Sequence, residues 1–267
     1  MSSPESWRLK FDRAQDHFRD FKREVRAYSE SHPYKAVRVS PPENHEDIWL
    51  YRLQITEQPD PHIGLIAGDL VHNLRSALDH LAVAITGRRD AAFPIHHEDP
   101  WELDHAGQLL SSREKARAAF TAAIDGAPDD AITVIQELQP FAAGSEWATH
   151  PLGLVGRLDN ADKHRELIPT TTGVTEGLSY VVRRSAVIFT FFWPQCNDGS
   201  EVAKFSWNPA DVPPESEVHV HVRGTPRVTV EVREINGYVE LAQAFTHILD
   251  GFGEVFDTLE RFVPARG

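Results

Sequence analysis

The chain has 267 residues, 41% of them hydrophobic, which is enough apolar material for a substantial core. Acidic residues outnumber basic ones by 40 to 27, and the resulting net charge of -13 opposes broad attraction to the backbone of DNA or RNA. The single cysteine, Cys196, excludes an intramolecular disulfide framework and a zinc cluster built on cysteines. We therefore expect one globular domain over residues 1–267.

The sequence contains neither an apolar run of 18 residues nor a positively charged start that leads into an apolar stretch. These are the patterns of a membrane span and of a signal peptide. We therefore expect a cytoplasmic protein with no membrane partner.

The first predicted element is a helix over about 4–30, because serines followed by Pro4 and Glu5 are typical of a helix start. Its apolar residues recur every three or four positions and form one seam for packing against another helix. Residues 35–55 contain two stretches rich in β-branched and aromatic residues, so we expect a β-hairpin there. The helical seam consists of Trp7, Phe11, Ala14, Phe18, Phe21, Val25 and Tyr28.

A second long helix is predicted over about 61–88, and shorter helices over about 100–110 and 112–125. Further helical segments over 129–168 include one that opens at Pro151.

Residues 178–234 change character, because valines alternate with polar residues on either side of Gly224-Thr225-Pro226. This pattern predicts an antiparallel meander. The three-four apolar spacing returns over 237–263 and predicts a terminal helix that packs with the first one. We therefore expect an α+β fold that is mostly α, a helical bundle formed by the N-terminal, central and C-terminal helices with an inserted small antiparallel β-sheet.

Residues 68–85, GDLVHNLRSALDHLAVAI, combine an apolar helix side with an unusual polar side. At about 100° per residue, the leucines gather on one side and should face a core. The opposite side lacks the lysines and glutamates that are typical of a solvated helix face. Its short polar groups suit a hydrogen-bond network or a polar cavity. They are Asp69, His72, Asn73, Ser76 and His80, with Arg75 and Asp79 beside them.

A second polar cluster lies at the end of the helix predicted from Pro151. Asn160 and His164 are four residues apart and share a helix face, which could turn toward the same cavity as His80. The alternative is that Asp159 with Lys163, and Asp162 with Arg165, are ordinary ion pairs on a solvated face. An RNA ligand would need a local basic pocket, for which the candidates are Lys163, His164 and Arg165, and the pair Arg183 and Arg184.

Four segments of the chain together resemble a group of uncharacterised actinobacterial and phage-associated proteins. The shared patterns are GDxxHNLRSALDHLA, FPI, an LQPF-like segment and NxDKHRxL. Here they occupy residues 68–82, Phe93 to Ile95, Leu138 to Phe141, and Asn160 to Leu167. This resemblance spans most of the chain and implies no assigned activity.

Arg75, four intervening residues and His80 match the R-x4-H pattern of HEPN domains, all-helical modules of which many are metal-independent RNases. The resemblance implies that Arg75 and His80 are catalytic and that a homodimer brings them together across its interface. Metal-free RNA cleavage needs a general acid or base and a cation near the scissile phosphate, and these residue types fit. The residue after the arginine of the family is often Asn, Asp or His, whereas Ser76 stands here. Supporting roles fall to His72, Asn73 and Asp79.

Metal binding is a further interpretation of the histidines. His72 and His80 lie two helical turns apart, about 12 Å along the axis, which is too far for both to bind one ion comfortably. Two neighbouring histidines also occur at His219 and His221 and in the loop cluster 96–99, but such pairs are common by chance. We therefore expect no metal and no cofactor. The motifs of P-loop NTPases, dinucleotide-binding folds, serine hydrolases and zinc proteases are absent from the sequence.

The sequence therefore predicts a HEPN-like metal-independent RNase or an RNA- or nucleotide-binding module. Such a protein would act in phage defence or a toxin system, with an antitoxin-like protein as partner. The alternative is a non-catalytic structural or interaction protein whose polar helix seam only specifies packing, with Arg75 and Asp79 as an i,i+4 ion pair.

Overall fold

A computed structural model describes residues 5–39, 46–146, 148–164, 167–232 and 237–264. The chain divides into two compact units. The first, which we call the helical unit, comprises Met1–Phe21, Gly64–Leu167 and Glu231–Gly267. The second, the sheet unit, comprises Lys22–Ile63 and Ile168–Val230. Each is described by itself, and the expectation of a single domain stays a prediction.

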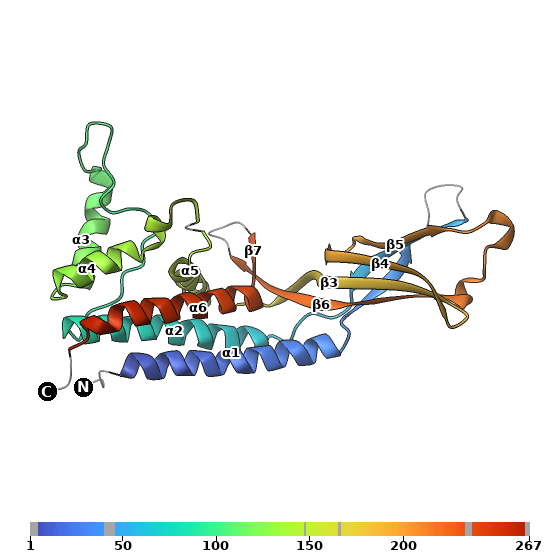
Figure 1. The fold of residues 1–267 in the computed structure, drawn as a ribbon, viewed down its shortest axis with the longest axis horizontal. Helices are drawn as coiled ribbons and strands as arrows, with labels where there is room; N and C mark the ends of the chain where they lie inside the picture. The colour runs from blue at the N-terminus through green and yellow to red at the C-terminus, as the bar shows by residue number, and fades with distance from the viewer. Residues whose placement is uncertain (1–4, 40–45, 147, 165–166, 233–236, 265–267) are drawn as a thin grey trace. The chain divides into compact units, whose positions relative to one another are not determined.

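Apart from the helix predicted over 100–110, the α-helices of the described residues lie close to their predicted positions (Figure 1). None of these helices combines the length and the hydropathy that crossing a bilayer requires. The helices are α1 (Ser6–Glu30), α2 (His62–Thr86), α3 (Glu114–Ala123), α4 (Asp129–Glu137), α5 (Pro151–His164) and α6 (Leu241–Leu259).

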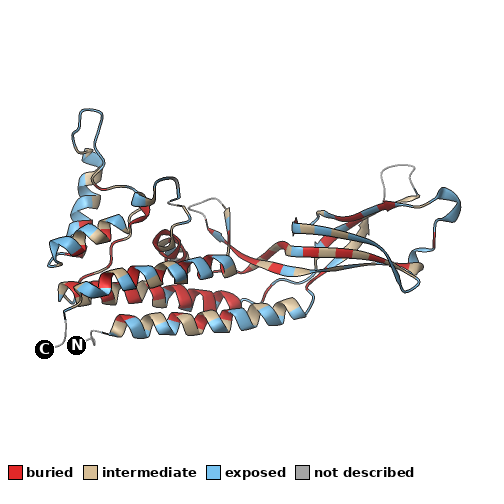
Figure 2. Ribbon diagram, in the orientation of Figure 1, coloured by how far each residue is buried: buried red, intermediate tan, exposed pale blue. Residues whose placement is uncertain are grey.

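The predicted packing of the first and last helices against each other is confirmed. The rings of Trp7 and Phe256 lie 4.9 Å apart, and those of Phe21 and Phe245 lie 5.2 Å apart. The start of α1 therefore meets the end of α6, so the two helices run antiparallel. The apolar side of α2 is buried as predicted, since its leucines at 70, 74, 78 and 81 are inaccessible to solvent. Figure 2 shows the buried stripes along α2 and α6.

The helix predicted over 100–110 is wrong. Residues 101–110 form turns, with an isolated bridge between Leu103 and Leu109. The carboxylate of Asp104 accepts hydrogen bonds from the backbone N–H groups of Ala106 and Gln108 at 2.8 and 2.9 Å. Gly107 has a positive φ of 76°. A short acidic side chain that binds its own backbone competes with helix formation, and here it wins.

The sheet unit is built from long antiparallel strands in two sheets. One has the strand order β1-β2-β5 and the other β4-β3-β6-β7, the last strand lying beyond the unit in sequence. Apolar side chains from both sheets, among them Trp49, Leu53, Val174 and Val181, form one buried cluster. The strands are β1 (Tyr34–Val39), β2 (Ile48–Ile55), β3 (Thr170–Arg183), β4 (Ala186–Asn197), β5 (Glu201–Ser206), β6 (Val218–Val232) and β7 (Gly237–Glu240).

The predicted fold class, a mostly helical bundle with an inserted small sheet, is therefore wrong. Of the described residues, about 49% are helical and about 27% lie in strands, and one of the two antiparallel sheets curls into a half-barrel. The predicted hairpin at 35–55 does form, with β1 pairing antiparallel to β2, but β2 also pairs with β5. The hairpin thus belongs to a full sheet.

Two features explain why the sequence predicts less sheet than the structure contains: one turn signal lies inside a strand, and one actual turn has no signal. Gly224-Thr225-Pro226 was expected to end a strand, yet β6 runs straight through it, and register shifts in β3 accommodate the mismatch. Conversely, β3 and β4 are joined by a tight turn at Arg184 and Ser185, whose φ angles are 49° and 70°. Non-glycine residues seldom adopt positive φ, so this turn has no sequence signature.

The buried side of α6 predicts a strong dependence of stability on one aromatic residue. Phe252 is fully buried on α6 and lies 5.9 Å from the ring of Phe256. Phe252→Ala should lower the free energy of unfolding by about 3–5 kcal/mol, because it removes transfer energy and leaves a cavity. Urea unfolding measures the loss. Leu9→Ala, at an exposed position of α1, is the control and should change stability little. Equal stability losses in the two variants would contradict this packing.

Candidate functional site

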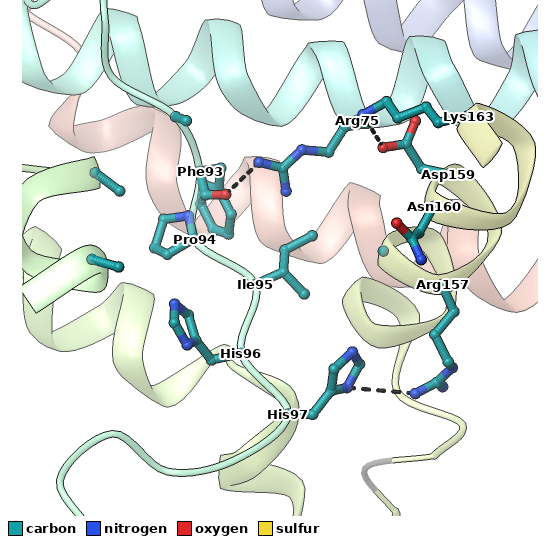
Figure 3. Close-up of a pocket in the computed structure, with 14 residues that line it drawn as sticks. Arg75, Phe93, Pro94, Ile95, His96, His97, Arg157, Asp159, Asn160 and Lys163 are labelled. Carbon is teal, nitrogen blue, oxygen red and sulfur yellow. Dashed lines mark hydrogen bonds and ion pairs between the residues drawn. The ribbon is translucent and has the colours of Figure 1, made fainter. Parts of the chain in front are cut away.

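A cleft of about 630 Å³ lies in the helical unit, lined by residues of α2, α3, α5 and the connection that follows α2 (Figure 3). The predicted site residues Arg75, Asn160 and Lys163 line it. So do His96, His97 and Arg157, which the sequence did not assign to a site. Asp159 is the acidic residue among the described residues that line this cleft.

Arg75 and Asp79 hold the backbone at Phe93 against α2. The Arg75 guanidinium donates to Asp79 Oδ1 at 2.9 Å and to the carbonyl oxygen of Phe93 at 2.7 Å. The backbone N–H of Phe93 donates to the same Asp79 oxygen at 2.9 Å. We call these three residues the Phe93 clamp. It contains the expected i,i+4 ion pair and also satisfies both backbone polar groups of a buried residue.

A buried amide anchors the next part of the connection. Gln139 is inaccessible to solvent, and its side-chain N–H group donates to the carbonyl oxygens of Pro94 and Ile135 at 3.0 and 3.1 Å. Its side-chain oxygen accepts from the backbone N–H of His96 at 2.9 Å. The LQPF-like segment thus positions the residues that follow the FPI segment. The sequence analysis gave Gln139 no role of its own, although an amide between apolar neighbours is a pattern that indicates a buried hydrogen-bonding side chain.

Helix α5 brings the second polar cluster to the opposite side of the cleft. Lys163 Nζ lies 2.6 Å from Asp159 Oδ2. The Asp159 side chain is 8% exposed, whereas that of Lys163 is 53% exposed. The ion pair considered as an alternative is therefore present, and it lines the cleft. A Cβ on Gly68 would collide with the carboxylate of Asp162, so α2 approaches α5 closely there.

Imidazoles and Arg157 form the remaining polar part of the cleft. Arg157 Nη1 lies 3.4 Å from His97 Nδ1, and Arg157 also donates to the carbonyl oxygen of Ala148. Burial lowers the pKa of His97, and the charges of Arg157, His96 and His150 lower it further, while Glu98 opposes them. Burial also lowers the pKa of His96. Arg157 is buried within an apolar stretch of α5. A charged residue inside an apolar stretch indicates a site residue, and the sequence analysis did not use this pattern.

His80 takes part in a different contact. Its Nδ1 lies 2.9 Å from Ser6 Oγ of α1, and it does not line the cleft. Positions five apart on a helix point about 140° away from each other, so Arg75 and His80 leave α2 in different directions. His72 is exposed, and Asn73 donates to the backbone of Asp69 at 2.8 Å.

Two predicted residues fall where little or nothing is described. Arg165 lies outside the described residues, and of His164 only the backbone, at the end of α5, is described. Asn160 lines the cleft and His80 does not, so the cavity expected to be shared by these two residues is not this cleft. The expected approach of His80 to His164 stays a prediction. Within the described ranges, no group of three or more His, Cys, Asp or Glu side chains is arranged to hold a metal ion.

The four segments that carry the resemblance converge around this one cleft. Residues 68–82 supply Arg75, and the FPI and NxDKHRxL segments line the cleft directly. The LQPF-like segment supplies Gln139, which anchors the FPI connection. Comparison with protein-family models, with curated proteins and with solved structures found no match.

The histidines around the cleft predict an acid-sensitive fold. The native structure lowers the pKa of His96, His97 and His150, in each case first through burial. The stability that comes from their neutral form is fully present above the unfolded pKa of about 6.5, and it is lost as the pH falls through the lowered native values.

The free energy of unfolding should therefore decrease between about pH 7 and about pH 5.5, as measured by urea titration at each pH. His97→Gln should make this decrease shallower. His105→Gln, at an exposed turn position, is the matched control. A pH dependence that is identical in wild type and His97→Gln would show that His97 does not contribute.

Proposed function

We propose that this protein is an RNA- or nucleotide-binding module and that the cleft receives a phosphate group of the ligand. The observation that carries the proposal is the convergence of Arg75, Arg157 and Lys163 on one concave surface of a chain with net charge -13. Such a local concentration of cations supplies the attraction that the whole protein opposes.

The three cations differ in how free they are to meet a ligand. Arg75 is committed to the Phe93 clamp, and Arg157 is buried beside His97. Lys163 is half exposed, and its ammonium group has three N–H donors, so it can donate to a phosphate while it keeps its contact with Asp159. We assign Lys163 as the principal phosphate ligand. Arg157 adds positive electrostatic potential to the same cleft.

The remaining walls of the cleft suit the rest of a nucleotide. Pro94, Ile95, Ala119 and Ala123 present apolar surface. The cleft volume of about 630 Å³ falls within the roughly 300–1,000 Å³ of small-molecule sites. A base can therefore pack on the apolar wall while its phosphate meets Lys163.

Opposite effects of two neighbouring substitutions test this site. Lys163→Gln should weaken binding of a fluorescent single-stranded RNA about tenfold, equivalent to roughly 1.4 kcal/mol, because it removes the exposed cation. Asp159→Asn should strengthen binding, because it removes the competing carboxylate while keeping the shape of the side chain. Fluorescence anisotropy at fixed salt measures both, and adenosine monophosphate serves as the competitor.

Arg117→Gln, on the exposed side of α3, is the matched control and should leave affinity unchanged. If Lys163→Gln and Arg117→Gln weaken binding equally, the attraction is a general charge effect and the cleft is not the site. If Asp159→Asn weakens binding, Lys163 is not the phosphate ligand.

The metal-independent RNase activity implied by the R-x4-H resemblance stays a proposal, with Arg75 and His80 as its expected catalytic pair. It is tested by incubating the protein with single-stranded RNA in EDTA. If His80 is catalytic, His80→Gln should abolish cleavage and leave binding at the cleft intact. Cleavage that survives in His80→Gln but is lost in His97→Gln would instead place the chemistry in the cleft.

A structural role for the polar side of α2 is the second candidate, and the Phe93 clamp favours it. Arg75→Ala would leave Asp79 and the Phe93 carbonyl group without their guanidinium partner in a partly buried place. The free energy of unfolding should fall by about 1–3 kcal/mol, measured by urea unfolding. Lys163→Gln, at a half-exposed position, should cost less. Unchanged stability in Arg75→Ala would refute the structural role of the clamp.

A further inference from the structure

Strand β4 is an outer strand with one open edge. In the order β4-β3-β6-β7 it pairs with β3 on one side, and among the described strands none pairs with it on the other. Such an edge presents unpaired backbone N–H and C=O groups that can template a further strand. Figure 2 shows how little of β4 is buried.

Most side chains of β4 are apolar, and several of them are exposed on both faces of the sheet. Phe192, opposite Leu178, is 81% exposed, and Val187 is 60% exposed. Phe189 stands opposite the buried Val181 and stacks on a core aromatic ring, yet 41% of it is exposed. Apolar residues on both faces of this outer strand are therefore exposed to solvent.

The segment 189–193 of this edge lacks the usual protection against association. From Ala186 to Asn197 the sequence contains no charged residue, although 25% of the chain is charged. Natural edge strands commonly carry lysine, proline or a bulge to prevent pairing. Here a register shift near Ile188 and the proline at 194 stand outside the segment 189–193, which pairs regularly with β3. The segment 189–193, between the register shift and the proline, therefore has an edge on which a further strand can pair.

We propose that β4 pairs antiparallel with the β4 strand of a second copy of this chain, about a two-fold axis within the segment 189–193. Antiparallel pairing of identical strands is the arrangement that a two-fold axis generates, and it presents the same surface from both copies. The proposal names a surface outside the helix that carries R-x4-H, and it does not rest on the proposed function.

A second copy suits this edge on grounds of charge. Two copies of net charge -13 repel each other, so a contact between them has to avoid like charges placed directly opposite. An uncharged strand meets that condition against itself. Each copy also offers the apolar side chains that the other needs, since Phe192 of one copy lies on the same sheet face as Thr190 and Phe192 of the other. Exposed apolar patches of this kind mark interaction sites.

The test is the mass of the full chain in solution, measured by size-exclusion chromatography with light scattering. Wild type should be a dimer, and Phe192→Lys or Thr190→Lys should raise the dissociation constant of the dimer at least about tenfold. Leu9→Lys, at an apolar position of α1 that is 66% exposed, is the matched control and should remain dimeric. Circular dichroism and thermal unfolding should show that the lysine variants at 190 and 192 stay folded.

Cross-linking locates the contact independently. Thr190→Cys should be joined between copies by a short bis-maleimide, because diagonal positions across paired strands are only about 7–8 Å apart. Thr225→Cys, exposed on β6 of the same sheet, should not be joined, and neither should wild type, whose Cys196 is buried. A monomeric wild type overturns the proposal. A dimer that survives both lysine substitutions, or one cross-linked equally through Thr225→Cys, places the interface elsewhere and overturns it as well.

Discussion

The candidate site depends on how four residues of irregular backbone are held against α2. The connection from Phe93 to His96 has no strand or helix partner, so its buried N–H and C=O groups must find side chains. Asp79 and Arg75 satisfy Phe93, and Gln139 satisfies Pro94 and His96. An unsatisfied buried group costs roughly 1–3 kcal/mol, so these contacts determine the path of the chain. That path places His96 and His97 opposite α5.

Because of this constraint, the cations on the two walls of the cleft differ: Arg75 of α2 is held by the clamp, whereas Lys163 of α5 is half exposed. Arg75 lines the cleft, but both hydrogen bonds described for its guanidinium belong to the Phe93 clamp. The groups on α5 are arranged differently, because Lys163 is half exposed while its partner Asp159 is buried. A cleft with a fixed cation on one wall and a movable one on the other can admit an anion without rebuilding its walls. Preorganisation of this kind lowers the cost of binding.

The sheet unit is stabilised differently, because its core consists of side chains packed between two antiparallel sheets. Aromatic residues of β2 and β5 pack against β3 and β4 and leave the outer edge of β4 uncovered. The uncharged character of that strand would be a liability in a monomer, and pairing with an identical strand removes it. Its sequence was recognisable as β-forming, but which of its edges is open depends on strand order.

The sequence by itself determined the long helices, because their apolar periodicity needs only local geometry: the buried side of α2 and the seam between α1 and α6 agree with it. It also predicted that Asn160 would share a cavity with the polar side of α2, but it named His80 there, whereas the cleft contains Arg75. Only the tertiary structure decided that His80 turns to Ser6 while His97 and Arg157 join the cleft, because these directions depend on which helix packs on each side. It likewise decided that β3, β4 and β6 form long strands of one sheet. Strand pairing links residues far apart in the chain, and local turn signals such as Gly224-Thr225-Pro226 yield to it.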